Sequence, residues 1–296
     1  MNAWKAVLAI LLTSALLIIS ARVSPGTPEP VRITAHTERI TMTHTASFVH
    51  AGEESSPLFS VRVEGPIAPD EFNVALRYKP VLEEEFSFSE SFIRLEMPLG
   101  AEAIDDYEVY LTHYPRGDRI AYYIEVEDTS GAVLATLPEN GGPKGELLPF
   151  QFRGIPQAWI VIVRTSCMFA ALLAATMALL AALGLKRQPE AISFLGKAIL
   201  WATMLLLFGG VVFEIVFTRE VFGGLGWGGW PVGEFDFAHT RTEIVLLFWI
   251  ALTILLKGSV FTGRTAGNLV SSGTARLLTL VGYVLILTVY LIPRQL

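Results

Sequence analysis

Four long apolar runs in the C-terminal half constrain this chain more than any other feature. They span residues 158–185, 196–217, 241–257 and 277–293. A helix needs roughly 20 apolar residues to cross a bilayer, so the first two runs are long enough and the last two are near the lower limit. Only 17% of the 296 residues are charged, against about 25% in soluble domains. The sequence therefore predicts a four-helix transmembrane domain over residues 158–293.

Residues 31–153 differ in character, because most of the charged residues lie in this part of the chain. The segment Val31–Pro156 holds 21 of the 28 acidic and 10 of the 22 basic residues. Apolar and polar residues alternate along it, which places the apolar side chains on one face of each strand. Strands are expected at about 31–36, 39–49, 59–64, 72–78, 91–97, 106–113, 119–126 and 132–137. Seven or eight short strands predict an all-β sandwich of the immunoglobulin or fibronectin-III type.

Residues 1–22 have the pattern of an export signal. Lys5 precedes the apolar run Ala6–Ile19, whose 14 residues fall short of the roughly 20 that cross a bilayer. We predict cleavage after Ala21. An uncleaved N-terminal anchor is the alternative, because Ile19 is large at a position where the peptidase prefers a small residue. In both cases the segment that follows is delivered outside the cytoplasm.

The loops between the apolar runs predict the orientation of the chain. The loops after the first and third runs carry the basic residues Lys186, Arg187, Lys197, Lys257, Arg264 and Arg276. The positive-inside rule places these two loops in the cytoplasm. We therefore predict a protein of the bacterial cytoplasmic (inner) membrane, with residues 31–156 and the C-terminus on the extracytoplasmic side.

The outer loop, residues 218–240, has an unusual composition. It holds six glycines and five aromatic residues, and Trp residues favour the interface between membrane and water. We expect an ordered loop that lies on the outer leaflet. Its interfacial residues are Gly223, Gly224, Trp227, Gly229, Trp230, Pro231 and Gly233.

A polar set follows in the same loop, formed by Glu234, Asp236, His239 and Glu243. On a helix, Asp236, His239 and Glu243 would lie on one side, where an imidazole and two carboxylates hold a divalent transition metal. The alternative is structural: Asp236 caps the helix that follows, and His239 is an interfacial residue. The sequence leaves both interpretations open.

Two ionisable residues, Arg164 and Glu214, lie well inside the apolar runs. A charge in this position suggests a functional role and a partner of opposite charge. The two residues either form an intramembrane ion pair that fixes two helices, or both extend to the outer headgroups.

Several function classes find no support in the sequence. No segment concentrates Lys and Arg as nucleic-acid binding requires, so no nucleic-acid partner is expected. The single cysteine, Cys167, excludes a disulfide scaffold. The sequence contains no phosphate-binding loop, no Gly-x-Ser-x-Gly motif and no histidine deep inside an apolar run for haem. No cofactor and no catalytic residue is expected, and the scattered histidines are predicted to be surface residues: His36, His44, His50 and His113.

The stretch Gly229-Trp230-Pro231-Val232-Gly233, which an acidic and Thr-rich segment follows, resembles uncharacterised bacterial membrane proteins. Those proteins are similar to this chain in joining an exported β-sandwich to a few helices, and the resemblance implies no mechanism. The leading hypothesis is a non-enzymatic envelope protein in the lipid bilayer. Its sandwich would bind a membrane or periplasmic protein, or a second copy, as an interaction module or accessory subunit. Two alternatives remain: a metal-binding protein or enzyme that uses residues 234–243, and a small transport or sensing unit in which Arg164 and Glu214 form a switch.

Overall fold

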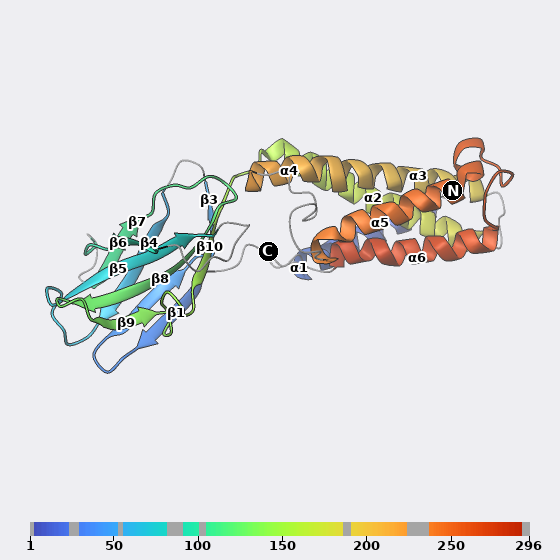
Figure 1. Ribbon diagram of the computed structural model, residues 1–296. Helices are drawn as coiled ribbons and strands as arrows, with labels where there is room; N and C mark the ends of the chain where they lie inside the picture. The colour runs from blue at the N-terminus through green and yellow to red at the C-terminus, as the bar shows by residue number, and fades with distance from the viewer. Residues whose placement is uncertain are drawn as a thin grey trace. The chain divides into compact units, whose positions relative to one another are not determined.

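The computed structural model describes residues 3–23, 30–52, 56–81, 91–100, 105–185, 191–223 and 237–291. The chain divides into two compact units, whose elements are labelled in Figure 1. The helical unit comprises Met1–Pro25, Pro156–Glu220 and Gly224–Leu296. The sheet unit comprises Gly26–Ile155 together with Val221–Gly223.

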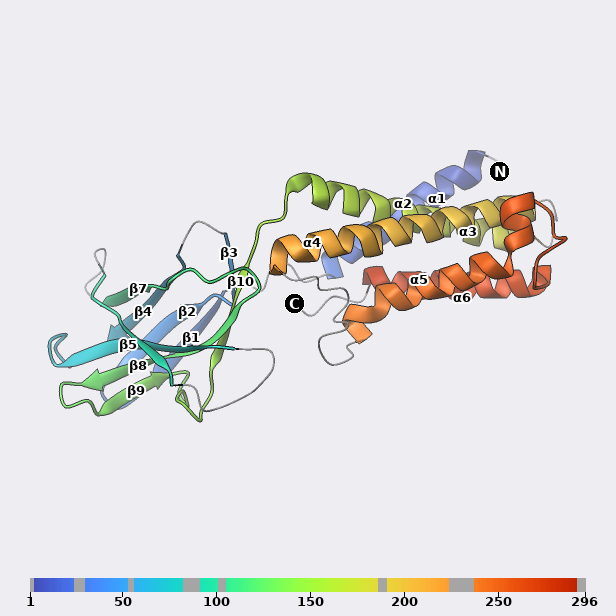
Figure 2. The same ribbon diagram turned by 45° about the horizontal axis from the view of Figure 1, so that its top comes forward.

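The described part of the sheet unit folds into one sheet of four strands and one of six (Figure 2). The first sheet has the order β1-β2-β4-β7, and the second has the order β3-β10-β8-β5-β6, with β9 also pairing with β8. The strands are β1 (Val31–His36), β2 (Thr41–Ala46), β3 (Val49–Ala51), β4 (Leu58–Glu64), β5 (Phe72–Pro80), β6 (Ile93–Glu96), β7 (Asp106–Tyr110), β8 (Arg119–Asp128), β9 (Val133–Leu137) and β10 (Leu148–Arg153). Their pairings are antiparallel except that of β3 with β10.

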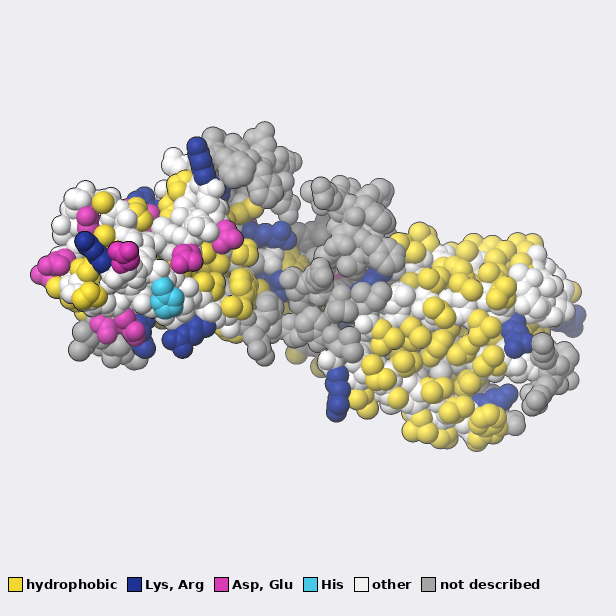
Figure 3. Space-filling model, turned by 90° about the horizontal axis from the view of Figure 1, so that it is seen from below, with side chains coloured by type: hydrophobic (Ala, Val, Ile, Leu, Met, Phe, Trp, Pro, Cys, Tyr) yellow, Lys and Arg dark blue, Asp and Glu magenta, His cyan; other side chains and the backbone are white. Residues whose placement is uncertain are grey.

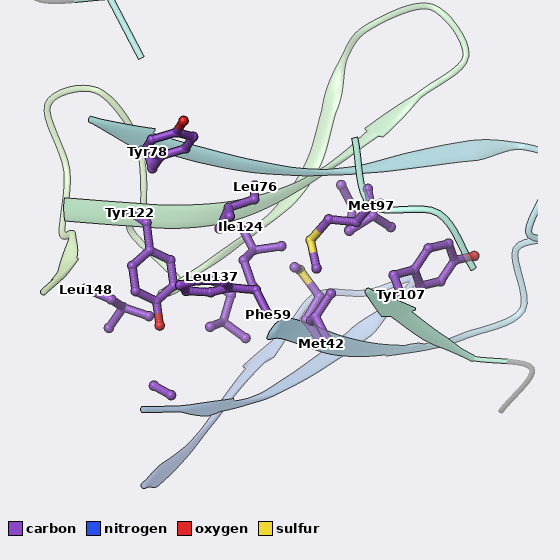
Figure 4. Close-up of a cluster of buried hydrophobic side chains, with 14 of the residues drawn as sticks. Met42, Phe59, Leu76, Tyr78, Met97, Tyr107, Tyr122, Ile124, Leu137 and Leu148 are labelled. Carbon is purple, nitrogen blue, oxygen red and sulfur yellow. The ribbon is translucent and has the colours of Figure 1, made fainter. Parts of the chain in front are cut away.

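The core of the sheet unit lies between the two sheets, where the apolar faces of their strands meet. Figure 4 shows Met42 and Phe59 of the first sheet beside Leu76 and Ile124 of the second. These side chains are buried because alternate residues of each strand point inward. A two-sheet sandwich with its own core is therefore present.

The strands differ from the sequence-based expectation in two places. The segment expected as one strand over 39–49 forms β2 and β3, which belong to different sheets. Strand β10 was not expected, although its inward residues Leu148, Phe150 and Phe152 alternate with polar or outward residues. Pro149 obscured this pattern, because proline seldom lies inside a sheet.

The helical unit contains six α-helices and two π-helical turns among its described residues. They are α1 (Ala3–Val23), α2 (Ala158–Gly184), α3 (Ala191–Leu207), η1 (Phe208–Val212), α4 (Phe213–Phe222), α5 (Phe237–Leu255), η2 (Gly258–Thr262) and α6 (Ser272–Leu291). Four helices in the described ranges are long and apolar enough to cross a membrane: Ala3–Arg22, Ala158–Gly184, Ala191–Phe222 and Ser272–Leu291. The structure thus contains a β-sheet region and four candidate membrane spans.

These four spans are not the same set as the four apolar runs. The N-terminal helix α1 qualifies, because the helix extends beyond the 14 apolar residues at both ends. Helix α5, which covers most of the run 241–257, has 19 residues and is not among the four. The second span continues to Phe222, so the loop expected over 218–240 begins later. The span Ala191–Phe222 ends before Gly223, which adopts a positive φ of 73°. Glycine accepts this conformation without strain at a helix C-terminus.

Small residues allow the helices of this unit to approach one another closely. The inward face of α2 is lined by alanines: Ala171, Ala174, Ala175, Ala178, Ala181 and Ala182. On α3, a Cβ atom added at Gly196 would lie 2.6 Å from the backbone carbon of Ser259. Close packing through small side chains is characteristic of helices in membranes.

Charged side chains divide the helical unit into two ends. One end, called here the basic end, carries Lys5, Lys197, Lys257, Arg264 and Arg276. Lys5 lies close to the end of α2 at this basic end, since a Cβ atom added at Gly184 would be 3.4 Å from the Lys5 Nζ atom. The surface between the ends is apolar, and Figure 3 shows hydrophobic side chains over it with Lys and Arg side chains toward its two ends. The described acidic residues of the unit, Glu214, Glu220 and Glu243, lie toward the opposite end, together with the basic residues Arg22, Arg164, Arg219 and Arg241.

Candidate functional site

Arg164 of α2 and Glu214 of α4 form an ion pair in the helical unit. The Nε and Nη2 atoms of Arg164 both contact Oε2 of Glu214, and Nε donates a hydrogen bond to it. The guanidinium carbon also lies 4.7 Å from the centre of the Phe217 ring, one turn beyond Glu214. The side chains are 23% and 11% exposed. The structure therefore brings together the two ionisable residues that the sequence placed inside the apolar runs.

The π-helical turn η1 ends immediately before α4 and sets the direction of Glu214. A π-turn inserts one residue, which rotates all later residues by about 100° around the helix axis. The turn contains Gly209 and Gly210, and a Cβ added at Gly209 would lie 2.8 Å from the Cβ of Cys167 on α2. The π-turn packs closely against α2, and its extra residue rotates α4 so that the Glu214 side chain points toward Arg164.

Polar groups from three helices meet next to this pair. The Tyr290 hydroxyl of α6 donates a hydrogen bond to the backbone oxygen of Met168, one turn from Arg164 on α2. The Ser20 hydroxyl of α1 donates to the backbone oxygen of Tyr290. On α5, Arg241 and Thr242 are buried near the same end of the unit. This layer of polar side chains, with the ion pair, is the main candidate site in the helical unit.

The polar set of the outer loop lies largely outside the described residues. Glu234 and Asp236 are not described, and His239 is described only as part of the first turn of α5. Glu243 is half-buried on α5. The described ranges contain no group of three His, Cys, Asp or Glu residues that would hold a metal. Of the interfacial loop residues only Gly223 is described; Gly224, Trp227, Gly229, Trp230, Pro231 and Gly233 are outside the described ranges.

His44 corrects the expectation that the strand histidines lie on the surface. It is 3% exposed and lies between the two sheets. Its Nδ1 atom donates to the backbone oxygen of Ser60 at 2.6 Å, so its Nε2 atom accepts from the Tyr122 hydroxyl at 2.9 Å. The imidazole is neutral in this arrangement, because both ring nitrogens are used and only one carries a proton. The inward position of His44, between Met42 and Ala46, was the signal that could have located it.

Burial lowers the pKa of His44 below its ordinary value of 6.5, and the hydrogen bond to Ser60 offsets only part of this effect. The unfolded chain takes up a proton below about pH 6.5, whereas the folded chain does not until its lower pKa is reached. We therefore expect the sheet unit to lose stability as the pH falls from 6.5 toward that pKa. Hydrogen-exchange protection of β2 and β4, corrected for the intrinsic rates, measures this loss. The substitution His36→Gln, at an exposed histidine, should leave it unchanged, and a profile that is flat between pH 7 and pH 5 would contradict it.

A network of ion pairs covers the outward face of the second sheet. Arg77 on β5 donates to Glu125 and Glu127 on β8, and Arg94 on β6 contacts Glu127 and Glu96. Burial raises the pKa of Glu125, and the hydrogen bond from Arg77 offsets part of this effect. The network joins three neighbouring strands and therefore reads as a structural feature of the sheet.

No model of a protein family and no curated protein sequence matches this chain.

Proposed function

We propose that this chain is a non-enzymatic integral membrane protein of the bacterial envelope, which presents its sheet unit outside the cytoplasmic membrane to a protein partner. The sheet unit would be a domain of the immunoglobulin or fibronectin-III type. It would act as an interaction module or as the accessory subunit of a membrane complex. The proposal is carried by one observation: an acidic, independently packed sheet unit is joined to a helical unit that carries five basic residues and no described acidic residue at one end, and its three described acidic residues toward the other.

The basic end supports the orientation. Lys5, Lys197 and Lys257 lie at the same end of the helical unit as Arg264 and Arg276. Basic residues favour the cytoplasmic side of a membrane. The chain enters the sheet unit after α1 and leaves it before α2, and both connections lie at the end of the helical unit away from the basic end. The distribution of basic residues therefore favours an extracytoplasmic sheet unit and C-terminus.

The packing of α1 favours the anchor over the cleaved signal. Thr13 and Thr176 are fully buried, and the Thr13 hydroxyl donates to that of Thr176 at 3.3 Å. Cleavage after Ala21 would remove this contact and expose polar groups of α2 and α6 to lipid. We therefore expect the intact mass of the purified protein to include residues 1–21. A mass that starts at Arg22 would show that the helix is removed.

The most exposed apolar pair on the first sheet offers a surface for a partner. Leu58 and Tyr110 are directly opposite each other on β4 and β7 and are 47% and 66% exposed. Tyrosine is enriched in protein interfaces. Cross-linking in intact cells followed by affinity purification should recover a specific protein or a second copy. The double variant Leu58→Ser/Tyr110→Ser should lose it, whereas Val133→Ser, at another exposed apolar residue on β9, should keep it. A lone monomer in several mild detergents would refute the proposal.

A sensing unit is the second candidate function, and the π-turn η1 favours it. Such turns occur often at functional sites. A shift of η1 would rotate Glu214 away from Arg164 and break the ion pair.

The metal site at Asp236, His239 and Glu243 remains a prediction, which a metal assay on the purified protein and on His239→Ala would test.

A further inference from the structure

Two arginines share the outward face of the second sheet at the end where the chain leaves it. Arg119 begins β8 and lies directly opposite Gln151 of β10. Arg153 follows Gln151 by two residues, so its side chain is on the same face. Both belong to the sheet unit.

The Arg153 side chain is held in a fixed position. Its Nε and Nη2 atoms donate to Oε1 of Gln151 at 3.1 and 3.0 Å. Its guanidinium carbon lies 5.3 Å from the centre of the Phe222 ring. The backbone beside it is fixed as well, because Gly154 N–H donates to the oxygen of Val221 at 2.8 Å. An arginine held in this way loses little conformational entropy when it binds an anion.

The two guanidinium groups are close enough to repel each other. Burial lowers the pKa of Arg153, and the positive charge of Arg119 lowers it further. An anion placed between two such groups would relieve the repulsion and would accept hydrogen bonds from both.

The chain connectivity places this pair near the ends of two candidate membrane spans. Arg153 precedes Ala158, the first residue of α2, by five positions, which span at most about 18 Å. Phe222, which lies against Arg153, is the last residue of the span Ala191–Phe222. Two apolar residues, Ile155 between β10 and α2 and Trp159 in the first turn of α2, are 67% and 53% exposed. Exposed aromatic residues at the end of a span are typical of the membrane interface.

We propose that Arg119 and Arg153 bind the phosphodiester of an anionic phospholipid headgroup, which the short connection to α2 keeps within their reach. A guanidinium presents paired N–H donors that match phosphate oxygens. The lipid, rather than a soluble anion, is favoured because of the short connection to α2 and the exposed apolar residues beside it. This inference rests on the proposed membrane placement of the helices and is independent of the protein partner.

The experiment uses the full chain in nanodiscs of phosphatidylcholine that contain a small fraction of phosphatidylglycerol. Native mass spectrometry measures how much phosphatidylglycerol the released protein retains. The test variants are Arg119→Gln and Arg119→Gln/Arg153→Gln. The control Arg32→Gln/Arg39→Gln removes the same charge from two exposed positions elsewhere in the sheet unit. A conservative variant, Arg119→Lys, keeps the charge.

We expect Arg119→Gln to retain about fivefold less phosphatidylglycerol than the wild type, and the double variant still less. The control should retain as much phosphatidylglycerol as the wild type. Retention by Arg119→Lys should lie between that of the wild type and that of Arg119→Gln. Equal retention by all variants would overturn the proposal. The proposal would also be overturned if millimolar inorganic phosphate displaced all of the bound phosphatidylglycerol and by itself raised the unfolding temperature as much as the lipid does. The site would then serve a soluble anion. Failure of the chain to enter nanodiscs would instead reject the membrane placement.

Discussion

Replacing Arg164 by glutamine is expected to destabilise the helical unit by up to about 3–5 kcal/mol, because the buried carboxylate of Glu214 would lose its ion pair with Arg164. Glu214 is the shorter side chain of the pair and is 11% exposed, so it cannot reach the headgroups as arginine can. Glu214→Gln should cost less, because Arg164 can extend toward the membrane surface. The charge-swapped variant Arg164→Glu/Glu214→Arg should recover much of the lost stability.

Thermal unfolding in a mild detergent, combined as a double-mutant cycle, measures the coupling between the two residues. Arg219→Gln is the matched control, since Arg219 is exposed on the same helix α4 as Glu214. It should change stability by no more than about 0.5 kcal/mol. If Arg164→Gln, Glu214→Gln and the charge-swapped variant all lose no more stability than the control Arg219→Gln, the two charges act separately and the ion pair does not stabilise the protein.

Gly196→Val is expected to prevent normal packing of α3 against η2. An added Cβ would lie 2.6 Å from the carbon, 2.7 Å from the oxygen of Ser259 and 2.7 Å from the nitrogen of Val260. All three are backbone atoms, so no flexible side chain can move aside. Overpacking in a core costs about 1–3 kcal/mol and sometimes more, and we expect Gly196→Ala to fall in this range and Gly196→Val to exceed it.

Gly273→Ala provides the control for this prediction. Gly273 lies in the first turn of α6, and its added Cβ would have Ser271 Oγ as its nearest neighbour, at 3.9 Å. Because alanine favours a helix over glycine by up to about 1 kcal/mol, this variant should be neutral or slightly more stable. Thermal unfolding and the yield of monodisperse protein measure both effects. Equal behaviour of the variants at Gly196 and Gly273 would show that α3 and η2 do not pack closely.

Much of the fold could be predicted from the sequence, because its periodicity reports burial directly. Alternation over Phe72–Tyr78 predicts a half-buried strand, and β5 occupies Phe72–Pro80. The apolar run at 158–185 predicts a long helix, and α2 occupies Ala158–Gly184. The π-turns could not be predicted, since they depend on contacts between helices, as at Gly209 and Gly196, and not on local propensity.

The candidate site was predictable only in part. Arg164 and Glu214 stood out because charges are costly in apolar surroundings, but their contact depends on the rotation of α4 after η1. His44 could not be recognised as buried from its residue type. Its partners Ser60 and Tyr122 are 16 and 78 positions away in the sequence, so only the three-dimensional packing of the two sheets brings them together. Arg119 and Arg153 are likewise 34 residues apart and become neighbours through the pairing of β8 with β10.

The location of the sheet unit is the claim on which the proposed function depends, and cysteine labelling tests it directly. In a Cys167→Ser background, Thr129→Cys places one thiol at the exposed tip between β8 and β9, and Thr265→Cys places one between η2 and α6. A maleimide that does not cross membranes is applied to intact spheroplasts and to lysed ones. We predict that Thr129→Cys is labelled in intact spheroplasts and that Thr265→Cys is labelled only after lysis. Labelling of Thr129→Cys only after lysis would place the sheet unit in the cytoplasm and contradict the proposed function.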